Sequence, residues 1–376
     1  MSRFLRLSFA ACLLSFLLSI LTIPSAAKYP SISGECGCAY IPALDKMVYD
    51  KNATRRHPMA STTKIMTALV ALERTRPSDE VVVSPKAVGI EGSSIYLKAG
   101  EHQTMENLLY ALLLESANDA AAAIAIHTAG SIEAFADMMN THAAELELAD
   151  THFTNPHGLS DEQHYTTALD LARIAAAAME NETFYKIVST KQKTITSSDG
   201  TISRSLSNHN RLLRSYADCV GVKTGFTKKS GRCLVSAAER NGMLLIAVTL
   251  DAPDDWHDHV AMLDYGFSQY EGRVLSDCLD LSFTMPVVGG TSSEITVSAR
   301  SAPAVVVEQG SPALTMSVEL NRFAVAPVRR GDVLGLVRYT QNEKTVATVP
   351  LLADHSIEKI QTNETLWDKI KNIWNK

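Results

Sequence analysis

Residues 58–73 read PMASTTKIMTALVALE and contain the tetrapeptide Ser61-Thr-Thr-Lys64 at the beginning of an apolar segment. The apolar positions that recur at helical spacing are Ile65, Leu69 and Leu72, so the sequence predicts a helix here. Residues three apart share one helical face, which brings the Ser61 hydroxyl to the Lys64 amine. A desolvated lysine can lose its proton near neutral pH and activate a serine as a nucleophile. Alone, Ser-x-x-Lys is common on helix surfaces and specifies little.

A second polar segment, Ser116-Ala-Asn118, lies in a break between two predicted helices. A hydroxyl and an amide at such a position can relay a proton and hold a substrate amide. Ser and Asn are also standard residues of a capped turn, so this segment is ambiguous when taken alone.

A third segment, Lys223-Thr224-Gly225, ends a predicted strand. A cation beside a hydroxyl suits a substrate carboxylate, and glycine allows a ligand to approach the strand backbone closely. We expect the backbone N–H groups of Ser61 and Phe226 to stabilise a developing oxyanion. The alternative is a strand that simply runs into a turn.

Periodicity along the chain indicates an α+β fold. Helices are predicted over residues 58–73, 106–115, 120–128, 132–146, 167–179 and 253–270. Strands are predicted over residues 220–224, 232–238 and 243–250. This order lacks βαβ alternation, which favours an antiparallel sheet with helices over residues 28–280. We expect Asp119 to cap the helix at 120–128 and Gly130 to end it.

From residue 281 the texture of the sequence changes. Short β-branched runs alternate with Gly, Pro and Ser turns, which predicts a small all-β domain over residues 281–357.

The N-terminus has the pattern of a secretory signal peptide. Arg3 and Arg6 precede an apolar run over residues 7–23, which small residues follow at 25–27. We expect a signal peptide over residues 1–27 with cleavage after about Ala27. The apolar run is nearly long enough to span a bilayer, so an uncleaved anchor is the alternative.

The C-terminal residues 358–376 form a separate segment. One helical face carries Leu366, Trp367, Ile370, Ile373 and Trp374, and charged residues occupy the rest. Such an amphipathic helix suits a membrane interface. A helix that packs against its own domain is the alternative, because a helix this short is marginal alone in water.

Composition excludes some classes of function. A chain of 376 residues with a net charge of −6 is long enough for two domains and does not favour nucleic acid as a partner. Five cysteines beyond the signal, Cys36, Cys38, Cys219, Cys233 and Cys278, do not make a disulfide framework. Whether Cys219 and Cys233 pair across a hairpin stays open.

We expect neither a metal nor a cofactor. No His-Glu-x-x-His is present, and His257 and His259 are two apart on a predicted helix, so they point to different faces. His157 follows an Asn-Pro turn and is interpreted as structural. Arg211 lies shortly before the Lys-Thr-Gly strand and is either part of a carboxylate pocket or a surface residue.

Taken together, Ser-x-x-Lys, Ser-x-Asn and Lys-Thr-Gly in this order resemble the penicillin-binding D-Ala-D-Ala carboxypeptidases of the low-molecular-mass serine type. The resemblance covers most of the chain from about Ser31 to Ile357. Other stretches similar to that family are Gly92–Glu101, Ser116–Ala120, Phe153–Leu159, His164–Thr167 and Gly221–Thr227.

This resemblance implies a fold and an activity. The catalytic domain would be like that of serine β-lactamases, the β domain would be a sandwich, and the tail would be a membrane anchor. The enzyme would act on peptidoglycan stem peptides outside the cell, at the outer face of the cytoplasmic membrane. Penicillins, which resemble the D-Ala-D-Ala end, would acylate the same serine covalently.

The resemblance also implies roles for the site residues. Ser61 would attack the carbonyl between the two D-alanines while Lys64 takes its proton. Ser116, with Lys223, would pass a proton to the leaving D-alanine. Asn118 would hold the acyl chain, and Lys223 and Thr224 would recognise the terminal carboxylate.

Three alternatives remain. A β-lactamase of the class that shares these motifs has Ser-Asp-Asn and a separate deacylating glutamate, whereas this chain has Ala117 in the middle position. A non-catalytic scaffold would have lost some of the motif residues. A transpeptidase differs only in which acceptor reaches the acyl-enzyme, and the sequence does not show this.

Overall fold

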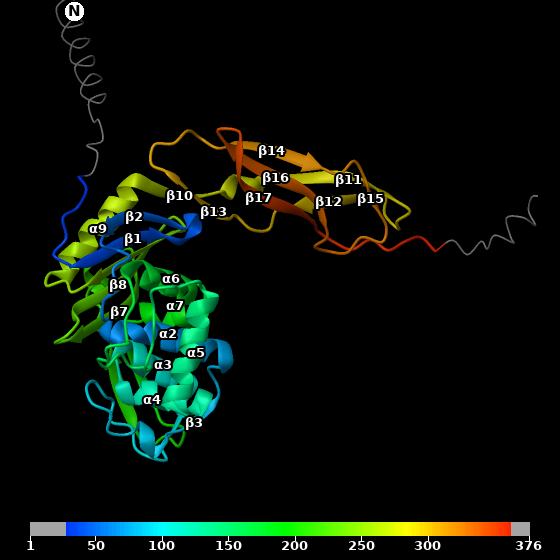
Figure 1. Ribbon diagram of the computed structural model, residues 1–376. Coiled ribbons are helices and arrows are strands. Elements are labelled where there is room, and N and C mark those ends of the chain that lie inside the picture. The colour runs from blue at the N-terminus through cyan, green and yellow to red at the C-terminus, as the bar shows by residue number, and fades with distance from the viewer. Residues whose placement is uncertain (1–27, 362–376) are drawn as a thin grey trace, which may run out of the picture. The chain divides into compact units, whose positions relative to one another are not determined.

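The computed structural model describes residues 28–361 (Figure 1). The predicted signal peptide and residues 362–376 of the predicted C-terminal helix lie outside the described residues. The described chain divides into two compact units, one of residues 28–238 and 245–269 and the other of residues 239–244 and 270–361. The second unit therefore begins before the predicted boundary at residue 281.

The first unit is built on a five-stranded sheet of order β2-β1-β9-β8-β7. Its strands are β1 (Cys36–Ile41), β2 (Lys46–Lys51), β7 (Cys219–Thr227), β8 (Gly231–Arg240) and β9 (Met243–Leu250). The predicted strands β7, β8 and β9 are confirmed. Strand β1 was not predicted; it pairs antiparallel with both β2 and β9. Every position of β1 is buried, because α6 and α9 both contact this strand.

Helices pack around this sheet (Figure 1). They are α2 (Lys64–Arg74), α3 (Met105–Leu114), α4 (Asn118–Ala129), α5 (Ile132–Glu145), α6 (Ala168–Met179), α7 (Glu182–Ser189), α8 (Leu212–Ser215) and α9 (Asp255–Gln269). The six predicted helices are confirmed to within a few residues, except that the first begins as a 3₁₀ turn, η2 (Ala60–Thr63). Helices α7 and α8 and the hairpin of β5 (Gln192–Thr196) and β6 (Ser203–Ser207) were not predicted. The short strands β3 (Glu80–Val82) and β4 (His102–Thr104) pair with each other.

The caps of α4 differ in part from the prediction. Gly130 ends the helix in the left-handed conformation, with φ of 84°, as expected. The expected cap by Asp119 is wrong, because α4 begins two residues before the predicted start, at Asn118, and its N-cap residue is Ala117. The Asp119 carboxylate instead accepts hydrogen bonds from the loop at residues 94–97.

The two cysteines of the β7–β8 hairpin do not pair. In the register of the two strands Cys219 lies opposite Ala238, and Cys233 lies opposite Gly225. Both are free thiols, as are the other cysteines of the described chain. The hairpin is confirmed, but its register keeps the two sulfur atoms apart.

The second unit is all β, as predicted. Its six-stranded sheet has the order β14-β16-β17-β12-β11-β15. The strands are β11 (Ser282–Val288), β12 (Glu294–Ser298), β14 (Thr315–Leu320), β15 (Ala324–Val325), β16 (Val333–Gln341) and β17 (Lys344–Ala353). A separate pair joins β10 (Tyr270–Val274) to β13 (Ala304–Glu308). Alternate residues along the strands, such as Ile295 and Val297, form a core cluster, which is the period-2 pattern expected for strands with one buried face.

The last described residues belong to this unit. The N–H of Ile360 donates to the carbonyl of Gly289, and Lys359 forms a bridge with Gly290. Residues 358–361 are thus not helical, so only residues 362–376 of the predicted amphipathic helix remain a prediction. Within residues 28–361, no helix is long and apolar enough to cross a membrane.

Candidate active site

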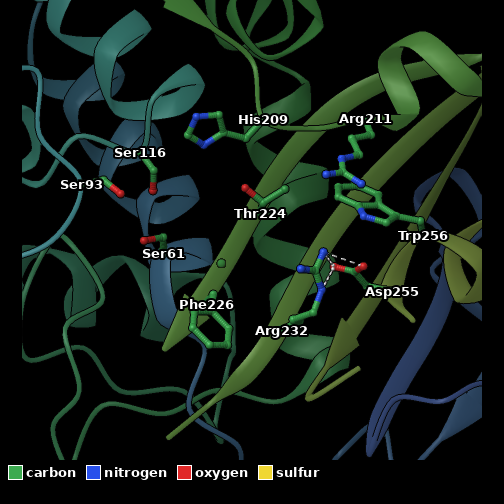
Figure 2. Close-up of a pocket in the computed structure, with 11 residues that line it drawn as sticks. Ser61, Ser93, Ser116, His209, Arg211, Thr224, Phe226, Arg232, Asp255 and Trp256 are labelled. Atoms are coloured by element: carbon green, nitrogen blue, oxygen red, sulfur yellow. Dashed lines mark hydrogen bonds and ion pairs between the residues drawn. The ribbon is translucent and has the colours of Figure 1, made fainter. Parts of the chain in front are cut away.

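A cavity of about 360 Å³ in the first unit brings together residues from all three sequence motifs. Its lining consists of Ser61, Ser93, Ser116, His209, Arg211, Thr224, Gly225, Phe226, Arg232, Asp255 and Trp256. Figure 2 shows the three serines gathered on one side of the cavity and the arginines with Trp256 on the other, with Thr224 of β7 between them. The cavity can therefore hold an extended ligand that reaches from the serines to the arginines.

Ser61 and Lys64 are brought together by local backbone geometry. Ser61 lies in η2, and Lys64 is the first residue of α2. In a 3₁₀ turn, side chains three apart nearly eclipse each other, and the Lys64 Nζ atom lies 3.1 Å from the Ser61 Oγ atom. The predicted contact is confirmed, although it is made by a 3₁₀ turn and not by an α-helix.

Two further acceptors surround the Lys64 amine, which is fully buried. Nζ donates to Oδ1 of Asn118 at 2.7 Å and to the backbone carbonyl of His157 at 2.6 Å. The His157 carbonyl oxygen is an acceptor. The Asn118 Oδ1 atom is also an acceptor, because the side-chain amide is oriented with its oxygen toward Lys64. Burial, together with the nearby charge of Lys223, holds the pKa of Lys64 well below its usual value of 10.5. A neutral amine has two N–H groups and one lone pair, so these acceptors direct the lone pair at Ser61.

The backbone around Ser61 is shaped by close contacts between distant segments. Ala60 has a φ of 49°, in the left-handed region that non-glycine residues rarely occupy. A Cβ atom at Gly158 would lie 1.9 Å from the Ala60 carbonyl oxygen, and one at Gly225 would lie 3.1 Å from the Ser61 nitrogen. Glycine at both positions lets the 158 turn and strand β7 pack directly against η2. The nucleophile is thus held by chain segments from three parts of the sequence.

The backbone of Ser116 is strained, and its hydroxyl group lacks a hydrogen-bond partner among the described residues. Its φ is 61°, its side chain is 6% exposed, and its Oγ atom forms no hydrogen bond with any described residue. A buried hydroxyl without a partner costs about 1–3 kcal/mol, and backbone strain of this kind is concentrated at functional sites. Because Ser116 lines the cavity with Ser61, its hydroxyl is available to a ligand.

The segment next to Ser116 is held by Asn118 and Asp119. The Asn118 backbone N–H donates to the Ser93 carbonyl at 2.7 Å, and its side-chain amide donates to the Glu91 carbonyl. Asp119 fixes the same loop through the N–H of Leu97 at 2.9 Å. These bonds place Ser93 on the cavity wall.

The Lys-Thr-Gly segment lies on β7, the edge strand of the sheet, and its lysine is not part of the cavity lining. Thr224 and Gly225 line the cavity. Lys223 is buried and donates from Nζ to the Thr224 carbonyl at 2.9 Å, and burial lowers its pKa to about 7. Phe226 is 66% exposed and lines the same cavity.

The far side of the cavity was largely missed by the sequence analysis. Trp256 lies near two guanidinium groups, those of Arg211 at 5.9 Å and Arg232 at 5.8 Å from the ring centroid. Arg232 forms a two-pronged ion pair with the buried Asp255, whereas no ion pair is recorded for Arg211 among residues 28–361. His209, also in the lining, lies 3.3 Å from the Glu115 carboxylate. Of these residues only Arg211 was singled out in the sequence, and it lies in the pocket.

The part of the chain that contains this site matches a known protein family. Residues 40–254, more than half of the chain, match the family model described as D-alanyl-D-alanine carboxypeptidase. The chain belongs to this family. Residues 283–359 match the model of the C-terminal domain of penicillin-binding protein 5, in agreement with the all-β second unit.

Individual members of the carboxypeptidase family resemble the chain over most of its length. The D-alanyl-D-alanine carboxypeptidase DacF of Bacillus subtilis strain 168 is 32% identical over 325 residues, which cover 84% of this chain and 83% of the relative. The crystal structure of the carboxypeptidase DacD from Francisella tularensis is 25% identical with a TM-score of 0.62, and the match covers 89% of this chain and 96% of that chain. The predicted fold class is confirmed by this match.

A shorter solved structure matches the catalytic part alone. The Streptomyces K15 DD-transpeptidase is 34% identical with a TM-score of 0.61, over 64% of this chain and 99% of that chain. The fold of the catalytic part therefore also occurs in a shorter protein, whose structure does not align with about a third of this chain.

Proposed function

We propose that this protein is a serine carboxypeptidase that removes the terminal D-alanine from peptidoglycan stem peptides through an acyl-enzyme on Ser61. The observation that carries the proposal is the buried Lys64 amine. The Lys64 Nζ atom donates hydrogen bonds to Asn118 and His157, and it lies 3.1 Å from the Ser61 Oγ atom. Family membership supplies the reaction class, and this geometry supports the proposed residue roles.

Acylation begins with proton transfer inside this cluster. The lowered pKa of Lys64 favours the neutral amine, and Nζ accepts the Ser61 hydroxyl proton as Oγ attacks the carbonyl carbon between the two D-alanines. The negative charge that forms on the carbonyl oxygen is stabilised by backbone N–H groups where Gly225 of β7 meets Ser61. The absence of a Cβ atom on Gly225 is what allows this approach.

Collapse of the tetrahedral intermediate breaks the amide bond and requires a proton on the leaving amine. The Ser116 hydroxyl has no partner in the described protein, so it is free to donate to the departing D-alanine and to be reprotonated from Lys64. Water then attacks the ester on Ser61 while Lys64 takes the proton of that water, and Lys64 returns the proton to Ser61 Oγ as the ester bond breaks. The products are D-alanine and a stem peptide one residue shorter, and the enzyme is regenerated.

The terminal carboxylate of the substrate has a receptor on the other side of the cavity. We propose that the Thr224 hydroxyl and the Lys223 ammonium bind it, assisted by Arg211, whose guanidinium has no recorded ion pair within residues 28–361. Trp256 supports Arg211 by a cation–π contact. Asn118 binds the acyl side of the substrate, and the exposed ring of Phe226 offers an apolar surface beside it. Penicillins carry an equivalent carboxylate and would acylate Ser61 in the same way.

A transpeptidase is the second candidate, because one similar structure is described as a DD-transpeptidase. Hydrolysis and transfer share the acyl-enzyme and differ only in the acceptor. The β-lactamase alternative is disfavoured by the family match, and the scaffold alternative is disfavoured by the assembled Ser61–Lys64–Ser116 cluster.

The test measures release of D-alanine from a diacyl-Lys-D-Ala-D-Ala peptide by the wild-type protein and by Ser61→Ala. We expect the mutation to abolish both this release and the covalent penicillin adduct. Penicillin labelling without D-alanine release, together with product formation only when an amine acceptor is added, would establish the transpeptidase instead. A folded wild-type protein with neither activity would refute both candidates.

We also propose that the enzyme acts outside the cytoplasm, at the membrane surface. The basic, apolar and small-residue order of residues 1–27 supports export. The pattern of residues 365–376, with Trp and Ile on one predicted helical face and Lys on the other, supports attachment at the membrane interface. Pelleting with anionic vesicles should be lost when residues 365–376 are deleted. Unchanged pelleting of the truncated protein would exclude this attachment.

A further inference from the structure

A cluster of metal-ligating groups lies outside the active-site cavity, on the sheet of the first unit. Glu35, His57 and Asp251 each offer a ligand atom, and these atoms all lie within 4.8 Å of one another. None of them lines the cavity described above. We propose that these three residues form a binding site for a single divalent transition-metal ion, with zinc as the best match.

The two carboxylates are placed side by side by the β1–β9 pairing. The register pairs Cys36 with Leu250, and one step further the Glu35 N–H donates to the Asp251 carbonyl at 3.0 Å. Glu35 and Asp251 therefore lie opposite each other as a continuation of the ladder. Like charges in directly opposite positions destabilise a sheet unless a cation lies between them.

Histidine 57 is rigidly oriented toward these carboxylates. It is 8% exposed, and its backbone forms a bridge with Thr166 in both directions. Its Nδ1 atom lies 2.8 Å from the carbonyl oxygen of Pro58, and a carbonyl can only accept, so the ring proton is on Nδ1. The Nε2 lone pair therefore faces the acidic pair. A backbone carbonyl that fixes the tautomer in this way is the usual outer-shell partner of a metal-bound histidine.

The two carboxylates differ in their partners. Glu35 is paired with Arg55 through one oxygen, and its other oxygen lies 3.5 Å from His57 Nε2. No hydrogen bond or ion pair of the Asp251 carboxylate is recorded within the described chain. Asp251 has a φ of 50°, and its carboxylate occupies the space beside Gly231 that a Cβ atom there would fill.

The distances leave room for a metal ion between the side chains. A protonated histidine bound to a carboxylate draws the two atoms to about 2.7–2.9 Å, which is shorter than the 3.5 Å between His57 and Glu35. Bonds of about 2.0–2.2 Å around a tetrahedral zinc ion separate neighbouring ligand atoms by roughly 3.4 Å. One imidazole and two carboxylates also neutralise a divalent ion, and water would supply the fourth ligand. Small rotations of the Glu35 and Asp251 side chains would complete the geometry.

The sequence shows no metal-binding spacing because the three ligands come from separate segments. This proposal therefore departs from the expectation that the protein binds no metal. Its effect would be to tie the ends of β1 and β9 to the segment that leads into Ser61, four residues after His57.

The test uses chelator-treated protein without a histidine tag, titrated calorimetrically with Zn²⁺ alone. We expect one equivalent to bind, and we expect His57→Gln and Asp251→Asn to weaken binding at least tenfold. The matched control is His257→Gln, which removes an exposed imidazole 3.1 Å from Asp254 and should leave zinc binding unchanged. Bound zinc should also raise the melting temperature of the wild type and not that of the two site variants.

Co²⁺ substitution identifies the ligands, since the buried thiol of Cys36 lies next to Glu35. We expect ligand-field bands of nitrogen and oxygen coordination without a thiolate charge-transfer band. A thiolate band, equal zinc affinity in all variants, or no saturable binding by the folded wild type would each overturn the proposal. Circular dichroism of the Asp251→Asn variant keeps the test valid if His57→Gln fails to fold. Each of these measurements reports metal binding or stability, so its outcome does not depend on the proposed enzymatic activity.

Discussion

At the scale of single residues, the base is defined by what surrounds its amine. The carbonyl groups of Asn118 and His157 accept hydrogen bonds from the Lys64 amine, which we propose to be neutral. An amide at position 118 can do this without adding charge, whereas a carboxylate cannot. The choice between asparagine and aspartate at this position therefore decides the protonation state of Lys64.

Replacing Asn118 with aspartate should inactivate the enzyme at neutral pH. The new negative charge would lie beside the Lys64 amine, raise the pKa of Lys64 and hold the amine in its protonated form. We expect penicillin acylation to fall at least a hundredfold at pH 7, the scale of a lost general base, and to recover as the pH rises. Stopped-flow acylation rates across pH would measure this.

Asn118→Ala is the control for this prediction. It removes the same hydrogen bond without adding a charge, so the rate should fall without moving the profile to higher pH. An aspartate variant with the pH profile of the wild type would show that Lys64 is not the titrating base.

Ser116→Ala should separate activity from stability. The Ser116 hydroxyl has no hydrogen bond among the described residues, so removing it should leave the protein equally stable or stabilise it by about 1 kcal/mol. Loss of a proton donor to the leaving group should lower kcat/KM by about 10²–10⁴-fold. Peptidase assays and urea unfolding of the same samples test both halves. A variant that loses stability along with activity would assign Ser116 a structural role.

At the scale of secondary structure elements, the start of α2 depends on the turn at Gly158. This glycine has a φ of 84° and faces the Ala60 carbonyl, where a Cβ atom would lie at 1.9 Å. Either the turn or η2 must move to make room for a side chain. Because His157 in the same turn supplies an acceptor for Lys64, such a shift would reach the base directly.

Gly158→Ala should therefore lower both stability and acylation. We expect a loss of more than 2 kcal/mol in unfolding free energy, above the roughly 1 kcal/mol of a left-handed alanine alone. The control is Gly200→Ala, whose φ is 75° but whose Cβ atom would meet nothing within 4 Å. Equal losses for the two variants, by urea unfolding, would contradict the steric argument.

The elements themselves were predictable where periodicity is strong. Leu-rich α3 and Ala-rich α4 follow from their apolar positions, and β7 to β9 follow from short segments separated by Gly- and Asn-containing turns. Strand β1 was missed because it contains Gly37 and two cysteines in place of β-branched residues, and its burial comes from partners far along the chain. The η2 turn was missed because its geometry is imposed by contacts with Gly158 and Gly225, which no local pattern reports.

Site residues that belong to short sequence motifs could be predicted, and the others could not. Ser61, Lys64, Ser116, Asn118, Lys223, Thr224, Gly225 and Phe226 were selected by matching motifs, and the structure brings Ser61, Ser116 and Thr224 to one cavity. Trp256 and Asp255 have no motif, because α9 reaches the cavity only through the folding of the sheet. Their roles and those of the motif residues stay predictions until the variants are measured.

At the scale of the whole molecule, the first unit should function alone. The Streptomyces K15 DD-transpeptidase aligns over 99% of its own length with 64% of this chain, which shows that this fold is stable without a full second domain. The cavity residues all lie in the first unit.

A protein of residues 28–269 should therefore fold and react with penicillin at a rate within a few fold of the longer protein. Labelling with a fluorescent penicillin after gel filtration measures this. Ser61→Ala in the same truncated protein is the control for non-specific labelling. A soluble, monomeric and unreactive fragment would show that the second unit contributes to the site. The assignment of residues 28–280 and 281–357 as two domains is itself a proposal that this experiment examines.

The dependence of Ser61 on distant segments makes the acyl-enzyme a reporter of conformation. In the proposed mechanism, Ser61 is reactive only while residues 118 and 157 hold Lys64 in place and strand β7 lies against η2. A chain in which any of these has come apart keeps an ordinary alcohol that penicillin does not acylate. The amount of bound labelled antibiotic would therefore report the fraction of native molecules in a mixture. The decay of labelling during heating would report the rate at which the tertiary structure around Ser61 is lost.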